Sequence, residues 1–156
     1  MNNIMRALAL GTLLLAGSMT AYAADPAVGT WKLNLAKSTF KPGPAPKSQV
    51  RSYAETPQGL LLTITTVGAN GAETTATTTF KDDGKDYPIT GNPDFDTVTV
   101  KRVDENTVNS TRKKAGKVVG HGVRSVSKDG KSLTFKQMAM TSDGKMSEDV
   151  MVYDRQ

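Results

Sequence analysis

Turn-forming residues punctuate this chain at regular intervals, and their spacing limits the possible fold more than any other sequence feature. From residue 59 onward a turn recurs roughly every 10–14 residues, and Asp-Gly-Lys forms three of these turns, at 83–85, 129–131 and 143–145. Glycine supplies the positive φ angle that a tight hairpin needs, and the preceding aspartate can bond the turn backbone. Each interval holds one strand and one turn, so the spacing predicts an antiparallel meander.

The segments between these turns are rich in β-branched residues, above all threonine, which fits a pleated surface better than a helix. No segment from 24 to 156 carries a convincing 3.6-residue apolar period. We expect ten strands, over 28–35, 48–56, 59–68, 72–81, 86–90, 95–103, 106–114, 117–127, 131–141 and 145–154. Short connections place sequence neighbours side by side, so the fold class is all-β, an antiparallel up-and-down β-barrel of about ten strands.

The first 23 residues have the three parts of a secretory signal peptide. Arg6 gives a positive start, Ala7 to Gly17 form an apolar run, and Ala21-Tyr22-Ala23 is an A-x-A cleavage site. The run is about half the roughly 20 residues that span a bilayer, so we expect cleavage near Ala23 and no membrane span. Residues 24–156 then form a single β-barrel domain that is periplasmic or secreted.

Composition excludes several classes of function. The 156 residues include no cysteine, so disulfides, thiol nucleophiles and cysteine zinc sites are excluded, and His121 is the single histidine. The net charge of +5, of which Arg6 contributes one, is small and evenly spread, which argues against nucleic-acid binding. No Gly-x-Ser-x-Gly elbow is present, and the paired carboxylates lie in turns or at strand edges. We therefore expect a monomeric protein that is not an enzyme, with no cofactor and no metal site.

Two short motifs bracket the predicted barrel. Val28-Gly29-Thr30-Trp31 carries a Gly-x-Trp near its start, and Val152-Tyr153-Asp154-Arg155 closes its last strand. In these motifs and in its strand count the chain resembles the calycin superfamily, with the length of the fatty-acid-binding-protein branch and the leader of the lipocalins. The resemblance implies structural roles for Gly29, Trp31 and Arg155, with the Trp31 indole at the closed end and Arg155 stacked over it, Arg124 being the second candidate.

The chain departs from the fatty-acid-binding-protein pattern in two places. Those proteins carry a helical lid after the first strand, whereas the Pro-rich segment 41–46 leaves no room for one, so we expect a barrel without a helical lid. They also bind a carboxylate with an Arg-x-Tyr on the last strand. Tyr153 matches the tyrosine, but Met151 stands where the arginine is expected.

The strands mix apolar and polar residues on both faces, as in a small barrel with a partly polar cavity. The candidate ligand-binding residues are Arg112, Arg124, Met138, Met140, Met151 and Tyr153. Flexible thioethers suit an adaptable apolar pocket, and inward arginines can hold an anionic head group. The alternatives are that the methionines are ordinary packing and that the arginines face solvent.

The leading functional hypothesis is an exported, non-enzymatic barrel that binds a small hydrophobic or amphipathic molecule in its cavity. A rival is a protein-interaction or inhibitor module with a solid barrel and a contacting loop. A third is a haem-binding barrel that uses His121, which glycines flank at 120 and 122. Glycine inside a strand marks either a close approach by a ligand or a simple bend, in which case His121 faces solvent.

Overall fold

A computed structural model of the chain describes residues 24–141 and 143–156, so the predicted leader lies outside the described residues. The elements are β1 (Gly29–Leu33), η1 (Leu35–Lys37), β2 (Thr39–Lys41), β3 (Ser48–Thr56), β4 (Gly59–Val67), β5 (Glu73–Phe80), β6 (Asp83–Pro88), β7 (Thr97–Arg102), β8 (Thr107–Lys114), β9 (Lys117–Val126), β10 (Ser132–Met140) and β11 (Met146–Arg155). All ten predicted strands are present, each within a few residues of its expected bounds.

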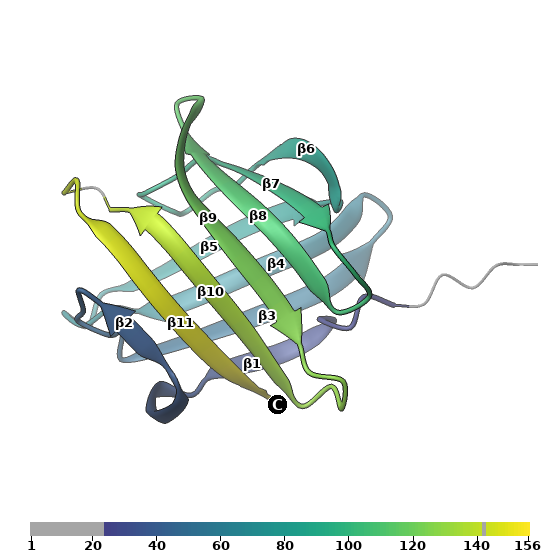
Figure 1. The fold of residues 1–156 in the computed structure, drawn as a ribbon, viewed down its shortest axis with the longest axis horizontal. Coiled ribbons are helices and arrows are strands. Elements are labelled where there is room, and N and C mark those ends of the chain that lie inside the picture. Colours follow the sequence, from purple (N-terminus) through teal and green to yellow (C-terminus); the bar gives the residue numbers. More distant parts are fainter. Residues whose placement is uncertain (1–23, 142) are drawn as a thin grey trace, which may run out of the picture.

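The strands form one antiparallel sheet that curls into a nearly closed barrel (Figure 1). The order is β5-β4-β3-β1-β11-β10-β9-β8-β7-β6, so β1 lies between β3 and β11. At the two edges, Thr77 of β5 and Thr90, which follows β6, exchange backbone hydrogen bonds of 3.0 Å in both directions. The predicted ten-stranded up-and-down barrel is therefore confirmed, with its seam between β5 and β6.

One further strand was not expected from the sequence. The three residues of β2 pair antiparallel with β11, with Lys41 opposite Glu148 and Thr39 opposite Val150. Between β1 and β3 the described chain otherwise holds only the single turn η1 and the Pro-rich segment that follows β2. The expected absence of a helix-turn-helix lid therefore agrees with the described structure.

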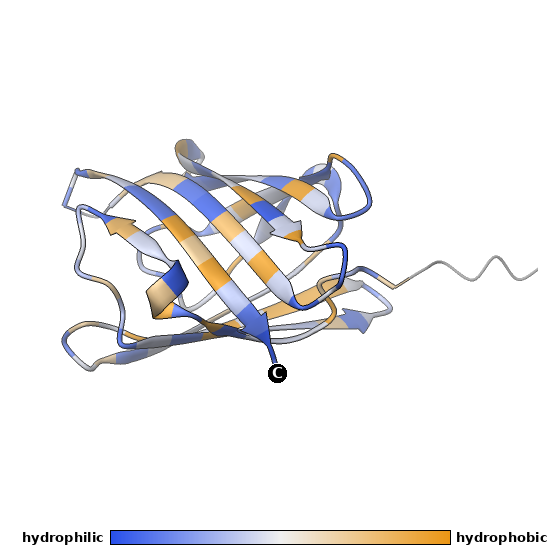
Figure 2. Cartoon of the chain, turned by 60° about the horizontal axis from the view of Figure 1, so that its bottom comes forward, coloured by the Kyte–Doolittle hydropathy of each residue, from blue (hydrophilic) through white to orange (hydrophobic). Residues whose placement is uncertain are grey.

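Alternate side chains of each strand point into the barrel, as the period of two requires. On β7, for example, Val98 and Val100 are buried while the neighbouring threonines are half-buried on the other face. The resulting stripes of hydrophobic and hydrophilic residues run across the strands in Figure 2. Trp31, Leu133 and Tyr153 are the largest fully buried side chains, and they gather where β1, β10 and β11 adjoin.

In the part of the chain that the structure describes, no helix has the length and apolar character of a transmembrane helix.

Candidate ligand-binding site

Three arginine side chains point into the barrel. Arg51 on β3, Arg112 on β8 and Arg124 on β9 are only 5, 8 and 3% exposed. Burying a charged group is costly unless a partner compensates it, so the partners of each arginine decide what it can do. Arg112 and Arg124 were predicted from the sequence as ligand-binding residues, whereas Arg51 was not.

Arg124 has a carboxylate partner near the closed end of the barrel. Its Nη2 donates to both carboxylate oxygens of Asp25 at 3.1 Å, and Arg102 forms a second ion pair with the same carboxylate. Burial alone would raise the pKa of Asp25, but the charge of Arg124 and the hydrogen bonds from Ala27, Arg102 and Arg124 outweigh it and lower that pKa. Arg124 was predicted from the sequence to contact a ligand. In the structure it belongs to a buried ion-pair network with Asp25.

Arg51 is held by neutral groups. Its Nε donates to the Tyr153 hydroxyl at 3.0 Å and to Gln49 Oε1 at 3.3 Å, and its Cζ lies 4.5 Å from the centroid of the Phe135 ring. Tyr153 in turn donates to Gln49 Oε1. Burial opposes the charge of Arg51, yet its interactions with Tyr153 and Tyr53 outweigh the burial, so the pKa is raised and the guanidinium stays charged.

Arg112 contacts aromatic rings. Its Cζ lies 4.9 Å from the Phe95 centroid and 5.1 Å from the Phe135 centroid, so Phe135 is shared with Arg51. Burial and then the like charge of Arg51 lower the pKa of Arg112 to about 10, so it too remains protonated at neutral pH. Among the described residues, no carboxylate lies within the 4.0 Å ion-pair distance of Arg51 or Arg112. The charges of Asp149 and Asp94, which line the same cavity as Arg112, act on it from a longer distance. The barrel interior therefore carries two positive charges without an acidic partner at ion-pair distance.

A cavity of about 670 Å³ opens at the end of the barrel opposite Trp31. Arg112 and Phe95 line its inner part, the segment from Phe40 to Pro44 and the β10–β11 turn line its rim, and Gln137 and Asp149 lie on its wall. The amide Nε2 of Gln137 donates to Asp149 Oδ2 at 2.6 Å, which fixes both groups. A second opening of about 560 Å³ lies at the same end, also lined by Phe40, Gln137 and Asp149.

Farther inside, the barrel is almost filled. A void of only about 60 Å³ remains, and it is lined by Arg51, Arg112, Arg124 and apolar side chains from β4, β7 and β10. Phe95 and Arg112 border both this void and the large cavity. The interior is therefore solid toward its closed end and open toward the loops.

The three methionines predicted to contact the ligand lie at different places in the barrel. Met151 is buried, and the Tyr153 hydroxyl lies 3.4 Å from its sulfur. Met138 and Met140 are 56 and 47% exposed and lie on the outer face of β10. Met138 does not line the large cavity, whereas Met140, beside the β10–β11 turn, lies at its rim. The reason is that Leu133 and Phe135 fill the inner face of β10, which sends every other residue of that strand outward.

The three residues given structural roles meet as the resemblance implied. The Arg155 Cζ lies 4.1 Å from the centroid of the Trp31 indole, and Trp31 Nε1 donates to the Ala27 carbonyl at 2.7 Å. Gly29 has a φ of +128°, and a Cβ atom there would come within 2.6 Å of Arg155 Nη1. A glycine is required because a side chain at position 29 would occupy the place of this guanidinium.

His121 lies on the outer face of β9 and is exposed, so it does not reach the interior as the haem hypothesis needed. The flanking glycines face inward instead. A Cβ at Gly122 would come within 2.5 Å of Phe135 Cζ, and one at Gly120 within 2.8 Å of the Ala139 side chain. These glycines therefore make room for β10 side chains, including the ring shared by Arg51 and Arg112.

Comparisons with known proteins give structural likeness alone. No family model and no curated protein sequence matches the chain. Among solved structures, zebrafish ileal bile acid-binding protein complexed with cholic acid aligns over 84% of this chain and 99% of its own, with 13% identity and a TM-score of 0.47. A redesigned β-barrel, mFAP0, bound to DFHBI aligns over 83 and 99%, with 18% identity and a TM-score of 0.44. The architecture that the strand order shows is a nearly closed antiparallel barrel of ten strands.

Proposed function

We propose that this protein is a non-enzymatic barrel that binds a small amphipathic molecule carrying an anionic group. The observation behind the proposal is the pair of buried arginines, Arg51 and Arg112, neither of which has an acidic partner at ion-pair distance among the described residues. Burial and the charge of Arg51 lower the pKa of Arg112, and an anionic group bound beside Arg112 supplies a close counter-charge.

The cavity volume decides where the rest of the ligand lies. The inner void of about 60 Å³ holds no more than a few water molecules, whereas the outer cavity of about 670 Å³ is within the usual range of roughly 300–1,000 Å³ for ligand pockets. The anionic group therefore sits at Arg112, with Arg51 behind it. The apolar part lies in the outer cavity, along side chains such as Phe40, Phe95 and Val119.

The proposed function includes export. Residues 1–23 carry the features of a cleaved leader, and the described barrel uses only residues that follow the expected cleavage site. Amino-terminal sequencing of the protein recovered from the periplasm of an expressing bacterium tests this part. A chain that begins at Ala24 is expected, and an intact Met1 on a cytoplasmic protein contradicts it.

A matched pair of ligands tests the binding site. Decanoate and decanol share an apolar chain and differ in the anionic group, so isothermal titration calorimetry should find tighter binding of decanoate. Arg112→Gln should weaken decanoate binding at least tenfold, because hydrogen bonds to charged groups contribute about 1.5–3 kcal/mol each. Lys101→Gln, an exposed change on β7, serves as the control and should leave binding unchanged. Equal affinity for both ligands, or an unaffected Arg112→Gln variant, contradicts the proposal.

A further inference from the structure

The outer wall of the barrel carries three exposed methionines and the single histidine of the chain. Met138, Met140 and Met146 are 56, 47 and 53% exposed, and His121 is exposed beside them. Long apolar side chains are usually buried, so barrel packing does not explain why three of them gather on a solvent-facing surface. This wall is formed by β9, β10 and β11, which run side by side in Figure 1.

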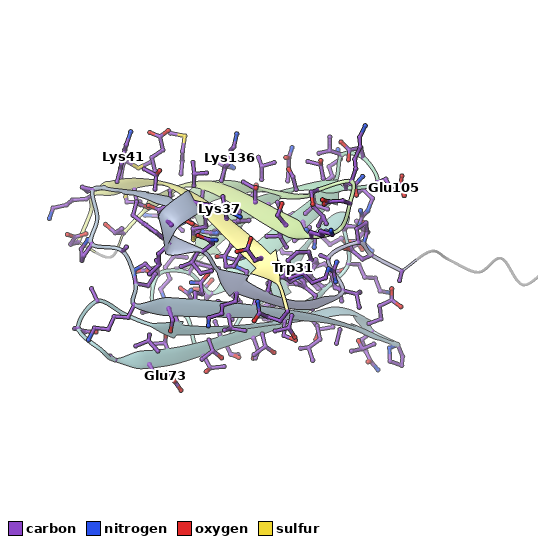
Figure 3. The ribbon with its side chains drawn as sticks, turned by 90° about the horizontal axis from the view of Figure 1, so that it is seen from below. Trp31, Lys37, Lys41, Glu73, Glu105 and Lys136 are labelled. Carbon is purple, nitrogen blue, oxygen red and sulfur yellow. The ribbon has the colours of Figure 1, made fainter. Side chains whose placement is uncertain are left out.

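The strand register brings these four side chains together. His121 on β9 lies directly opposite Met138 on β10, and Met140 lies directly opposite Met146 on β11. Directly opposed residues have Cβ atoms about 4.5–5.5 Å apart, and diagonal neighbours about 7–8 Å, within the reach of long side chains. Lys136, two residues before Met138 on the same face, projects outward in Figure 3. His121 and the three exposed methionines line one shallow groove of about 510 Å³ on this outer face.

A hydrogen bond orients the imidazole. His121 Nδ1 lies 3.3 Å from the Thr111 hydroxyl oxygen, on the adjacent strand β8. When Nδ1–H donates to this hydroxyl, the lone pair of Nε2 is left free to bind a metal ion. A second-sphere hydrogen bond of this kind accompanies most histidine ligands of metals.

From this arrangement we propose that His121, Met138, Met140 and Met146 form a surface site for a soft monovalent metal ion, copper(I) being the representative case. Three neutral thioethers and one neutral imidazole are soft or borderline ligands, a set that selects copper(I) rather than hard cations. Glu148, opposite Met138, adds one carboxylate at the edge of the site, where Lys136 also lies. No cluster of three or more His, Asp or Glu suited to a hard or borderline divalent ion is found among the described residues.

The metal site and the ligand cavity depend on different residues, apart from Met140, which lies at the edge of both. His121, Met138 and Met146 line the outer groove and not the cavity, whereas Arg51 and Arg112 point inward. Loss of metal binding and loss of decanoate binding are therefore separate outcomes, and each can be tested without the other.

Methionine methyl groups report directly on the site. In protein labelled with ¹³C at the methionine methyls, we expect one equivalent of silver(I) to shift the resonances of Met138, Met140 and Met146. The buried Met151 is an internal control in the same sample and should not move. Shifts of all four methyls alike, no shift at all, or equal shifts with zinc(II) would overturn the proposal.

Variants then identify the ligands. In competition with the chromophoric copper(I) chelator bicinchoninate, Met138→Leu, Met140→Leu and His121→Ala should each lower the copper(I) affinity at least tenfold. Leucine keeps the apolar volume and removes only the sulfur. Lys101→Gln, an exposed change on β7 that lies outside the groove, is the control and should bind copper(I) as the wild type does. If copper(I) binding persists in the leucine and alanine variants, or if the groove captures apolar probes but no metal, the proposal is wrong.

Discussion

The guanidinium of Arg155 stacks on the indole of Trp31, although the two residues lie at opposite ends of the folded chain. The same guanidinium donates to the carbonyls of Val28 at 2.7 Å and Pro26 at 2.8 Å, and to that of Gly130. One side chain thus joins the segment before β1, the turn before β10 and the end of β11.

Replacing Arg155 should therefore destabilise the closed end of the barrel. Arg155→Ala is expected to lower the free energy of unfolding by about 2–4 kcal/mol, because a cation–π contact and charge-assisted hydrogen bonds are lost together. Urea unfolding followed by the fluorescence of Trp31 measures the change. Arg155→Lys keeps the positive charge but lacks the planar guanidinium group. Its free energy of unfolding should therefore lie between those of the wild type and Arg155→Ala. A loss below about 0.5 kcal/mol would show that the stack is not stabilising.

Gly29→Ala should act through the same guanidinium. The new methyl group would overlap Arg155 Nη1, and the backbone φ of +128° is strained for any side chain. The matched control is Gly144→Ala, where φ is +79° and no atom lies within 4 Å of the added Cβ, so only backbone strain of about 1 kcal/mol is expected. Gly29→Ala should lower the free energy of unfolding by more than Gly144→Ala does. In a protein that already carries Arg155→Ala, the loss caused by Gly29→Ala should be smaller. Equal costs for the two glycine variants would contradict the steric explanation.

Methionine substitutions at two buried arginines should have opposite effects on stability. Arg112→Met removes a buried charge that has no acidic partner at ion-pair distance and that repels Arg51, so the unliganded barrel should gain about 1–3 kcal/mol. Arg124→Met removes the partner of Asp25 and should cost about 3 kcal/mol. Thermal unfolding of both variants, without ligand, gives the comparison. A destabilised Arg112→Met variant would mean that Arg112 is already compensated in the unliganded protein.

Acid unfolding should report on Asp25. Its pKa in the folded state lies below the ordinary value of 3.8, so the stabilisation it gives is present above about pH 4 and is lost as the pH falls through the folded value. Asp25→Asn should cost about 3 kcal/mol at pH 7, because Arg124 is left buried without a counter-charge. The difference from the wild type should shrink below pH 4. A difference that stays constant from pH 7 to pH 3 would exclude this ion-pair network as its source.

The strands could be predicted because glycine and aspartate mark the turns so clearly. Gly130 and Gly144 of the Asp-Gly-Lys turns have φ values of +69° and +79°, the left-handed conformation on which the prediction relied. β2 could not be predicted, since three residues show no periodicity and this strand exists only because β11 offers an edge for pairing. Tertiary pairing, rather than local propensity, forms that strand.

The site was harder to predict. The alternation of side chains along a strand divides them between two faces, but it does not identify which face lies inside the barrel. On β10 the choice was between Phe135 with Gln137 and Lys136 with Met138, and the charge of Lys136 was the one signal that its face is the outer one. On β3 the inner face carries Gln49, Arg51 and Tyr53, which is more polar than the outer face with Val50. Arg51 was missed for this reason, and only its register beside Trp31 places it inside.

The position of β1 between β3 and β11 has a consequence for how the protein is made. Because Trp31 pairs with Arg155, the ribosome must have synthesised β11 before β1 acquires its second neighbour. Contacts of such large sequence separation form late and slowly, since a long loop must close first. Until β11 has been made, β1 has only β3 as a neighbour, so the barrel stays open along that side of β1.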